Sequence, residues 1–333
     1  MVKSSENIFI FDWLTFSAKN RTVDDMKYLL CMAHVDWEEC AGRNFYRSGI
    51  TFHGVSIWFD GLRDNMGVCV NMSGKGCRAF ESHGSGCWET LIHFIVSDPF
   101  TYNISRIDIA YDDHIGLLDI DQMRSDVDAA YFVCRSKQWQ VHYGTEGTTL
   151  YFGSEKSDIM LRIYDKAAEQ GLSGEHWVRV ELQLRRDRAK HFVINVFENS
   201  YSIGKVFSGV LIGYLSFKQP TADTNKSRWE IADYWLQILE SLESIPYWES
   251  PAEEYNSGKL KKIVDTMYGN GIYTFINLYG ISGLLRTLYG RNRDLNDNYL
   301  RLLRECPADQ QSTFANELAD ILDFLGIDKE GNI

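Results

Sequence analysis

The chain has 333 residues, of which 44% are hydrophobic and 24% charged, and its formal net charge is −12. This composition is typical of a folded protein of about two domains and excludes a low-complexity or collagen-like chain. The acidic balance argues against a protein that coats nucleic acid, since non-specific affinity for DNA comes mainly from Lys and Arg, although a local basic cleft remains open.

Cysteine usage and hydropathy predict a cytoplasmic protein. The seven cysteines are an odd number without a Cys-x-x-Cys pair, so we expect reduced thiols rather than a disulfide framework or a zinc ribbon. The N-terminus lacks an apolar run long enough for a signal peptide. The longest weakly polar run, residues 204–217, is too short to span a bilayer.

The periodicity of apolar residues predicts the same order of elements twice. The first round is a strand at 8–17, a helix at 23–39, strands at 43–46, 51–59 and 66–72, a turn at 73–78 and a helix at 88–96. The second is a strand at 104–113, a helix at 119–134, and strands at 138–143, 148–153, 159–166 and 176–185. This order predicts an α+β fold, a mostly antiparallel sheet with helices on one face, and favours a duplicated unit.

The remainder of the chain predicts an α-helical C-terminal region. Helix-spaced apolar residues occur at 188–198, 201–217, 227–244, 259–267, 271–289, 295–305 and 307–325, with a linker at 246–258. We therefore expect one domain over 1–190, with related halves at about 1–100 and 101–190, and a second region over 191–333 for DNA recognition or dimerisation.

Two neighbouring strands place reactive side chains on one face. Alternation puts the following residues on that face: Arg162, Tyr164 and Lys166 in the first strand, and Arg179, Glu181, Gln183 and Arg185 in the second. A phenol, several cations and a carboxylate are the groups with which a tyrosine attacks a phosphodiester. The alternative is a half-buried strand tyrosine whose hydroxyl caps a hydrogen bond, and the 18 tyrosines of the chain favour it on residue type alone.

Acidic residues in two strands are candidate metal ligands. Asp108 sits between two isoleucines, where a carboxylate is costly to bury unless it binds metal or pairs with Arg106 or Arg179. With Glu181 it offers oxygen ligands suited to Mg²⁺ or Mn²⁺. Two further candidates are Asp112, although strand-end aspartates usually start turns, and His142, although a lone strand histidine is more often structural.

The glycine-bracketed segment 73–78 allows two interpretations. Its backbone N–H groups, with Lys75 and Arg78, suit a DNA phosphate, but its glycines equally suit a tight turn. The spacing of a nucleotide-binding P-loop is absent, so an ATPase is not indicated.

In combination, these motifs resemble the replication initiation factor family, which comprises rolling-circle plasmid initiators, relaxases of integrative conjugative elements and filamentous phage replication proteins. The matching motifs, in order, are Phe-Asp-Trp-Leu-Thr-Phe-Ser at 11–17, Met-Ser-Gly-Lys-Gly-Cys-Arg-Ala-Phe-Glu at 72–81, Arg-Ile-Asp-Ile-Ala-Tyr-Asp-Asp at 106–113, Thr-Leu-Tyr-Phe-Gly-Ser at 149–154 with Ser157-Asp158, Arg-Ile-Tyr-Asp-Lys at 162–166 and Trp-Val-Arg-Val-Glu at 177–181. The resemblance covers residues 8 to about 190 and fades beyond them.

The resemblance implies a metal-dependent endonuclease. Tyr164 would cut one strand, become linked to the 5′-phosphate and leave a free 3′-OH, while Asp108 and Glu181 would hold Mn²⁺ or Mg²⁺. Arg162, Lys166 or Arg179 would stabilise the added charge. From the residues themselves, Arg179 and Arg185 are candidate DNA contacts, with Lys75 and Arg78. The resemblance also implies a host helicase as a partner. Beyond the resemblance, we expect origin DNA, single-stranded or cruciform, and a second copy of the chain in a homodimer as partners.

Three functions remain open at this point. The first is a nicking–closing enzyme that starts rolling-circle replication of a phage or plasmid. The second is a relaxase of an integrative conjugative element, which uses the same chemistry for transfer. The third is a DNA-binding regulator that has the fold without the activity.

Overall fold

The computed structural model describes residues 8–144, 147–172, 174–198, 202–244, 264 and 269–289. The chain divides into two compact units, Met1–Glu254 and Tyr255–Ile333. The described helix of the second unit is α10, Gly269–Tyr289, which Gly280 interrupts with a φ of +72°. The linker at 246–258 and the helices at 259–267 (Val264 excepted), 295–305 and 307–325 lie outside the described residues.

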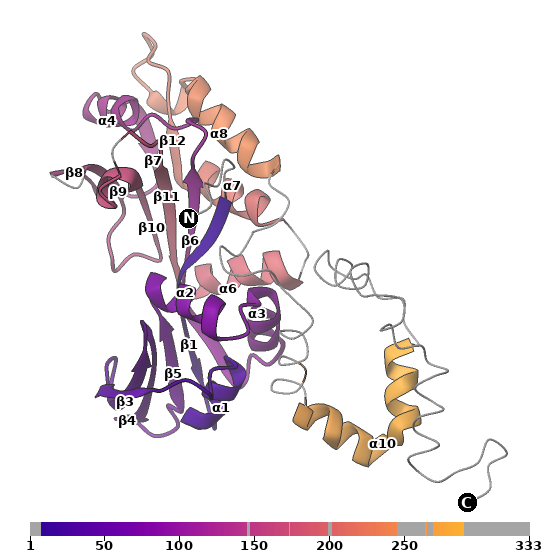
Figure 1. The fold of residues 1–333 in the computed structure, drawn as a ribbon. Coiled ribbons are helices and arrows are strands. Elements are labelled where there is room, and N and C mark those ends of the chain that lie inside the picture. The colour runs from indigo at the N-terminus through magenta and orange to yellow at the C-terminus, as the bar shows by residue number, and fades with distance from the viewer. Residues whose placement is uncertain are drawn as a thin grey trace, which may run out of the picture. The chain divides into compact units, whose positions relative to one another are not determined.

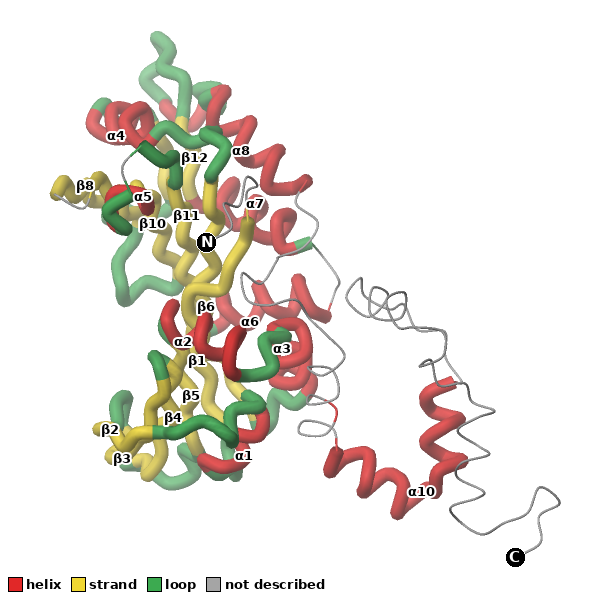
Figure 2. Tube along the Cα trace, in the orientation of Figure 1, coloured by secondary structure: helices red, strands yellow, loops and turns green. Residues whose placement is uncertain are grey.

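An antiparallel sheet of ten strands forms the centre of the first unit in the described part of the chain (Figures 1 and 2). The strands of its first half are β1 (Ile8–Ala18), β2 (Glu38–Ala41), β3 (Tyr46–Phe52), β4 (Val55–Gly61) and β5 (Val68–Met72). Those of its second half are β6 (Tyr102–Asp113), β8 (Trp139–Gly144), β9 (Gly147–Phe152), β10 (Ile159–Asp165) and β11 (Val178–Arg185).

The two halves have the same topology, which is what the repeated order of elements predicts. The strand order is β2-β3-β4-β5-β1-β6-β11-β10-β9-β8, so in each half the first strand lies beside the last and a meander runs outward from it. The halves meet where β1 pairs antiparallel with β6. The prediction of an α+β fold built on an antiparallel sheet is therefore confirmed.

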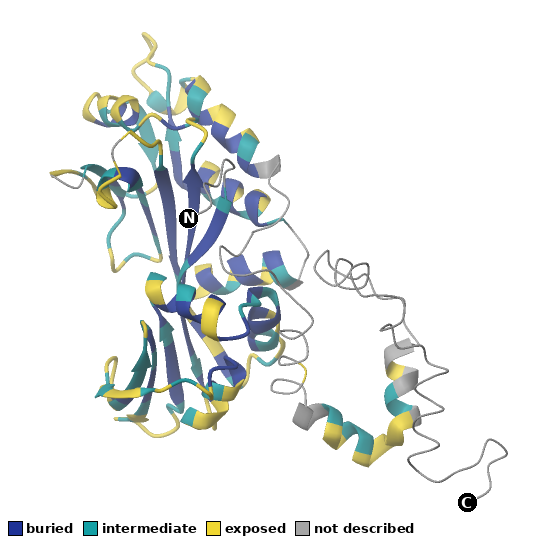
Figure 3. Cartoon of the chain, in the orientation of Figure 1, coloured by how far each residue is buried: buried dark blue, intermediate teal, exposed yellow. Residues whose placement is uncertain are grey.

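Helices cover the apolar face of this sheet, as expected. They are α3 (Trp88–Ser97), α6 (Asp187–Val193) with the π-helix η1 (Ile194–Glu198), and α7 (Ile203–Tyr214). Trp88 of α3 stacks on Phe11 at 4.5 Å between ring centroids, and Phe207 of α7 meets Phe9 at 5.1 Å. Figure 3 shows the buried residues gathered in the sheet and on the helix sides that face it. These contacts form the core behind the sheet.

A second layer extends the core behind the outer strands. The short strands β7 (Phe132–Cys134) and β12 (Leu215–Phe217) pair antiparallel. Phe132 meets Phe152 of β9 at 5.4 Å, and Phe217 meets Trp235 of α8 (Asp233–Ser244) at 5.1 Å. The described residues between 191 and 244 are therefore part of the first compact unit. Our predicted boundary near residue 190 does not coincide with the compact division at 254.

Several predicted elements are shorter or divided in the structure, and residues with a left-handed backbone interrupt some of them. The helix predicted at 23–39 ends as α1 (Val23–Leu29), and the strand predicted at 51–59 is a hairpin of β3 and β4 that turns at His53 and Gly54. The left-handed residues at these and similar points are Cys31 after α1, Asn44 and Phe45 in the segment predicted as a strand at 43–46, Gly54, and Ala130 after α4 (Ile120–Asp128).

The helix predicted at 201–217 ends at Tyr214 and continues as β12, and that predicted at 227–244 becomes the 3-10 helix η2 (Lys226–Arg228) and α8. Lys166 likewise leaves the strand predicted at 159–166 and begins α5 (Lys166–Glu169).

The segment at 73–78 is the first part of α2 (Gly74–His83), not a turn. The Ser73 hydroxyl caps the helix by accepting a hydrogen bond from the Gly76 N–H. A Cβ on Gly76 would lie 2.3 Å from the carbonyl oxygen of Gly54, so glycine allows α2 to approach the β3–β4 turn. The glycine therefore serves helix–sheet packing.

We predict that Gly76→Ala lowers the free energy of unfolding by about 1–3 kcal/mol, because the added methyl group overpacks a backbone contact. Urea denaturation followed by tryptophan fluorescence measures this change. The control is Gly209→Ala in α7, where a Cβ meets nothing within 4 Å. This control should gain about 0.5–1 kcal/mol from helix propensity, and equal effects of the two substitutions would contradict the close approach.

Candidate functional site

The face of the sheet opposite the core carries a polar cluster on strands β10, β11 and β6. Tyr164 lies opposite Arg179, which lies opposite Asp112. One pair further along, Arg162 lies opposite Glu181. Because directly opposite residues share a face, the register places the two predicted sets of reactive side chains side by side.

A bulge in β1 adds a carboxylate to this cluster. The register of β1 with β6 shifts between Phe11 and Trp13, and Asp12 is the residue at the shift. Its Oδ1 lies 3.5 Å from Nη1 of Arg179. Asp12 is not among the site residues that we predicted from the sequence. The signal was an acidic residue inside an aromatic strand, the same signal that identified Asp108.

Each of the other carboxylates in the cluster is paired with an arginine. Asp112 accepts two hydrogen bonds from Arg179, at 2.6 and 2.7 Å. Asp108 accepts from both Nε and Nη2 of Arg106, and Glu181 accepts from Nη2 of Arg162. The ion-pair alternative that we considered for Asp108 is therefore present in the structure, with Arg106 as its partner.

Burial and mutual repulsion make two of these carboxylates, Asp108 and Glu181, unusually basic. Burial raises the pKa of Asp108 and of Glu181, and both are about 1% exposed. Asp12 raises the pKa of both further, and Asp108 adds to that of Glu181, while the paired arginines oppose these effects. The negative charges of Asp12, Asp108 and Glu181 thus act on one another within one shielded patch.

Tyr164 is positioned to pass a proton to Glu181. Its hydroxyl donates to Oε2 of Glu181 at 3.4 Å, and the side chain is 8% exposed. Burial raises the pKa of the phenol well above its usual value, Glu181 raises it further, and Arg179 opposes the rise. The resting phenol is therefore neutral, and the adjacent carboxylate is its nearest proton acceptor.

Cations surround the Tyr164 ring. Nζ of Lys166, at the start of α5, lies 5.6 Å from the ring centroid and pairs with Glu169. The guanidinium carbon of Arg162 lies 5.9 Å from the same centroid. Positive charge on two sides of a phenol suits a phosphate group that gains negative charge during attack.

The carboxylate oxygens of the cluster are the type of ligand that a hard divalent ion prefers. Four carboxylates share the patch with three guanidinium groups that pair with them. The carboxylates are Asp12, Asp108, Asp112 and Glu181, and the guanidinium groups are those of Arg106, Arg162 and Arg179. Carboxylate oxygens are the ligands that Mg²⁺ and Mn²⁺ prefer. However, no three His, Cys, Asp or Glu side chains of the described residues are grouped closely enough to hold a metal by themselves. A metal here would share its carboxylates with arginines and take other ligands from the substrate.

The other predicted site residues lie outside this cluster or have structural partners. His142 is exposed on β8, two strands beyond β10, and its Nε2 lies 3.1 Å from Gln140 Oε1. The structure does not bring it to the carboxylates. Arg78 donates to the Phe11 carbonyl and to Glu81, so its guanidinium holds α2 against β1. Lys75 is exposed in the first turn of α2.

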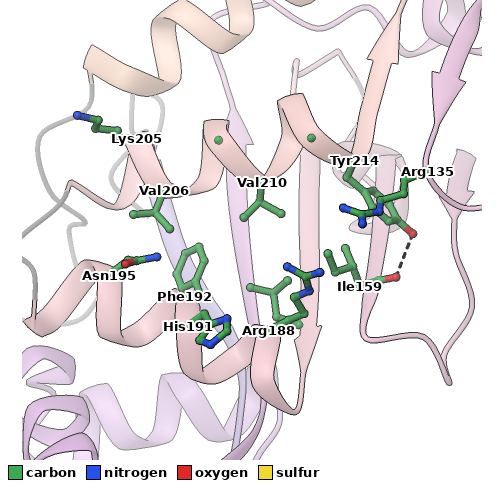
Figure 4. A pocket seen from close by; sticks show the side chains of 13 residues that line it. Arg135, Ile159, Arg188, His191, Phe192, Asn195, Lys205, Val206, Val210 and Tyr214 are labelled. Carbon is green, nitrogen blue, oxygen red and sulfur yellow. Dashed lines mark hydrogen bonds between the residues drawn. The ribbon is translucent and has the colours of Figure 1, made fainter. Parts of the chain in front are cut away.

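A separate cavity of about 520 Å³ lies between α6 and α7, behind the sheet (Figure 4). Its polar lining includes Arg135, Arg188 and His191, and its apolar lining includes Val206 and Val210 of α7. The Tyr214 hydroxyl closes one end by donating to the Ile159 carbonyl at 3.0 Å. Because none of the residues of the polar cluster lines this cavity, we do not assign it to the same chemistry.

We predict that Asp112→Ala lowers the free energy of unfolding by about 3–5 kcal/mol, because Arg179 stays buried and keeps, among the described residues, only the longer ion pair with Asp12. Chemical denaturation measures the loss. The matched control is Asp158→Ala, whose partner Arg186 is 71% exposed. Loss of that exposed pair should cost at most about 1 kcal/mol, and a similar cost for both would show that burial does not matter here.

Family models match almost all of the first unit. A model described as replication initiation factor matches residues 102–272, and one described as rolling circle replication initiation protein N-terminal domain matches residues 8–95. The boundary between them falls between the two halves of the sheet. No helix of the described residues is long and apolar enough to cross a membrane.

Similar proteins include relaxases and initiators. The chain is 23% identical over 266 residues to a putative DNA relaxase NicK of Bacillus subtilis (strain 168), covering 74% of this chain and 75% of that protein. It is 30% identical over 121 residues to a replication initiation protein of Staphylococcus aureus, covering 33% and 34% of the two chains. The solved structure of a rolling circle replication initiator protein from Geobacillus stearothermophilus matches with a TM-score of 0.69 and 29% identity, over 74% of this chain and all of that one.

Proposed function

Because the chain belongs to the replication initiation factor family, we propose that it nicks one strand of origin DNA with Tyr164 as the nucleophile. The observation that carries this proposal is the contact of the Tyr164 hydroxyl with Oε2 of Glu181 on the polar face of the sheet. A nucleophile beside a proton acceptor, with cations around it, is the arrangement that phosphoryl transfer by an amino-acid side chain needs.

The proposed step is an in-line displacement at phosphorus. The Tyr164 proton passes to Glu181, and the phenolate oxygen forms a bond to the scissile phosphorus. The bond from phosphorus to the 3′ oxygen breaks, and that oxygen takes up a proton from solvent. The products are a 5′-phosphotyrosine and a free 3′-OH. Arg162, Lys166 and Arg179 offset the negative charge that develops on the phosphate oxygens.

A divalent metal, Mn²⁺ or Mg²⁺, would be held by Asp12 and Asp108, two carboxylates of the patch that do not contact Tyr164. When bound, such an ion polarises a phosphate oxygen. From the sequence, we expected Glu181 to bind the metal together with Asp108. Its contact with Tyr164 favours the proton-acceptor role instead, and Asp12 takes its place as a proposed ligand. Asp112 is engaged by Arg179 and is proposed as a structural partner.

We predict that Tyr164→Phe abolishes covalent attachment to DNA and leaves the fold intact, because only the hydroxyl is lost. The measurement is a shift on denaturing gels with Mn²⁺ and single-stranded oligonucleotides tiled across the neighbouring intergenic region. Tyr151→Phe is the control, because Tyr151 lies opposite Arg162 on the adjacent strand β9. An adduct that persists in Tyr164→Phe and disappears in Tyr151→Phe would move the nucleophile to β9.

The rate of adduct formation should fall as the pH is lowered, because Glu181 must be ionised to accept the proton. Since the pKa of Glu181 is raised above the usual value of 4.5, the fall should begin at a higher pH than an exposed glutamate would give. Single-turnover rates from acidic to neutral pH measure this. Glu181→Gln should be slower throughout and should lack this acid limb. An unchanged limb in that variant would assign the proton acceptor to another group.

We predict that removal of divalent ions with a chelator abolishes the adduct and that Mn²⁺ restores it. Mn²⁺ should also raise the melting temperature of the wild type, because a ligand that binds only the folded state stabilises it. Asp12→Asn and Asp108→Asn should weaken both effects. Equal Mn²⁺ stabilisation in these variants and the wild type would place the metal elsewhere.

The similarity to a relaxase over most of both chains supports the second candidate, a conjugative relaxase that uses the same chemistry. The two functions differ in the fate of the nicked strand, which is copied in replication and transferred in conjugation. Genes for phage assembly or for conjugation beside this one would discriminate between them.

The third candidate, a non-catalytic regulator, predicts specific binding without an adduct. Origin DNA, a host helicase and a second copy of the chain are the proposed partners.

A further inference from the structure

Two arginines face each other at the end of the polar sheet face that is distant from Tyr164. Arg185 of β11 lies directly opposite Arg106 of β6. Like charges at directly opposite positions destabilise a sheet unless another group compensates them. Arg106 has such compensation, because Asp108 accepts from it and its guanidinium stacks on the Trp13 ring at 4.1 Å. Arg185 lacks an equivalent partner in the part of the chain that the structure describes.

The guanidinium of Arg185 is partly buried and incompletely bonded. Its Nε is buried without a hydrogen-bond partner, and it forms no ion pair among the described residues. Burial lowers the pKa of Arg185, and Arg106 lowers it further, while Asp108 and Glu155 oppose the change. A buried donor without a partner costs free energy that an incoming anion recovers.

Uncharged polar side chains continue the same row toward the first half of the sheet. Thr15 of β1 lies opposite Arg106, and Asn71 of β5 lies opposite Thr15. The Thr15 hydroxyl and the Trp13 N–H both donate to Oδ1 of Asn71, which fixes the amide and leaves its NH₂ group as a donor. A row across four neighbouring strands thus consists of Arg185, Arg106, Thr15 and Asn71. Thr15 and Asn71 bear no negative charge that would repel an anion.

This row is too distant from Tyr164 to contact the phosphate that Tyr164 attacks. Arg185 is six residues along β11 from Arg179, the residue opposite Tyr164. At a rise of about 3.3 Å per residue, that separation is roughly 20 Å. A single DNA strand lying along β11 and β6 would therefore present a different, non-scissile phosphate to Arg185.

We propose that Arg185, supported by the row of Arg106, Thr15 and Asn71, binds a backbone phosphate of the nicked strand a few nucleotides from the scissile bond. This proposal rests on the proposed function, because it takes the strand to be the DNA cut by Tyr164. Arg185 is a positioning residue, which fixes the register of the strand so that the correct phosphate reaches Tyr164.

The test uses full-length protein and single-stranded origin oligonucleotides in which one phosphate at a time is replaced by an uncharged methylphosphonate. Fluorescence anisotropy measures binding, independently of cleavage. In the wild type, one position outside the scissile bond should lose affinity roughly tenfold, as expected for a charged hydrogen bond. Arg185→Ala should show a similar loss with the unmodified oligonucleotide and no further loss at that position.

The matched control is Arg186→Ala, whose side chain is exposed and paired with Asp158. It should keep the wild-type profile. Arg185→Lys should retain part of the affinity and the sensitive position, which guards against a folding defect in Arg185→Ala. A profile in Arg185→Ala that still shows the wild-type sensitive position would overturn the proposal. Failure of the proposed function would instead appear as an intact Arg185-dependent position without any Tyr164 adduct.

Discussion

The antiparallel pairing of β1 with β6 is the constraint on which the site depends. It joins two halves of the same topology into one sheet, and it places Asp12 of the first half beside Asp108 and Arg179 of the second. The bulge at Asp12 matters as much as the pairing, because a strand of regular alternation shows only every second residue to a given face. The polar cluster is therefore formed by both halves, although its tyrosine belongs to the second.

The buried ion pairs of the cluster serve arrangement more than stability. Removing two charges from water costs free energy that their attraction largely offsets, so a buried pair contributes little net stability. What the pairs do is hold Arg162 and Arg179 in fixed positions around Tyr164. The Arg162 guanidinium also opposes the rise in the pKa of Glu181 that burial causes. The same contacts thus set the geometry and the proton affinities of the patch.

The alternation of residues in the strands was sufficient to predict the sheet, its repeated order and the shared face of Arg162, Tyr164, Arg179 and Glu181. That information is local, because side chains alternate along every strand. The sequence did not predict which residues pair across strands, so the partners of Asp108 and Arg78 were open. Nor did it predict Asp12, because a bulge depends on the partner strand. We did not predict the helix ends at which Cys31 and Ala130 adopt a left-handed backbone, because neither residue type indicates such a conformation.

The contact of Tyr164 with Glu181 has a consequence for the reverse reaction. A carboxyl group shielded from water and surrounded by other acids holds a proton more tightly than one at the surface. If Glu181 keeps the proton it receives, that proton stays next to the phosphotyrosine and is available when the bond to the tyrosine oxygen breaks again. Microscopic reversibility then makes the same carboxyl group the acid for resealing the strand. Nicking in this patch would exchange one phosphoester bond for another, and the same side chains would serve both cleavage and resealing.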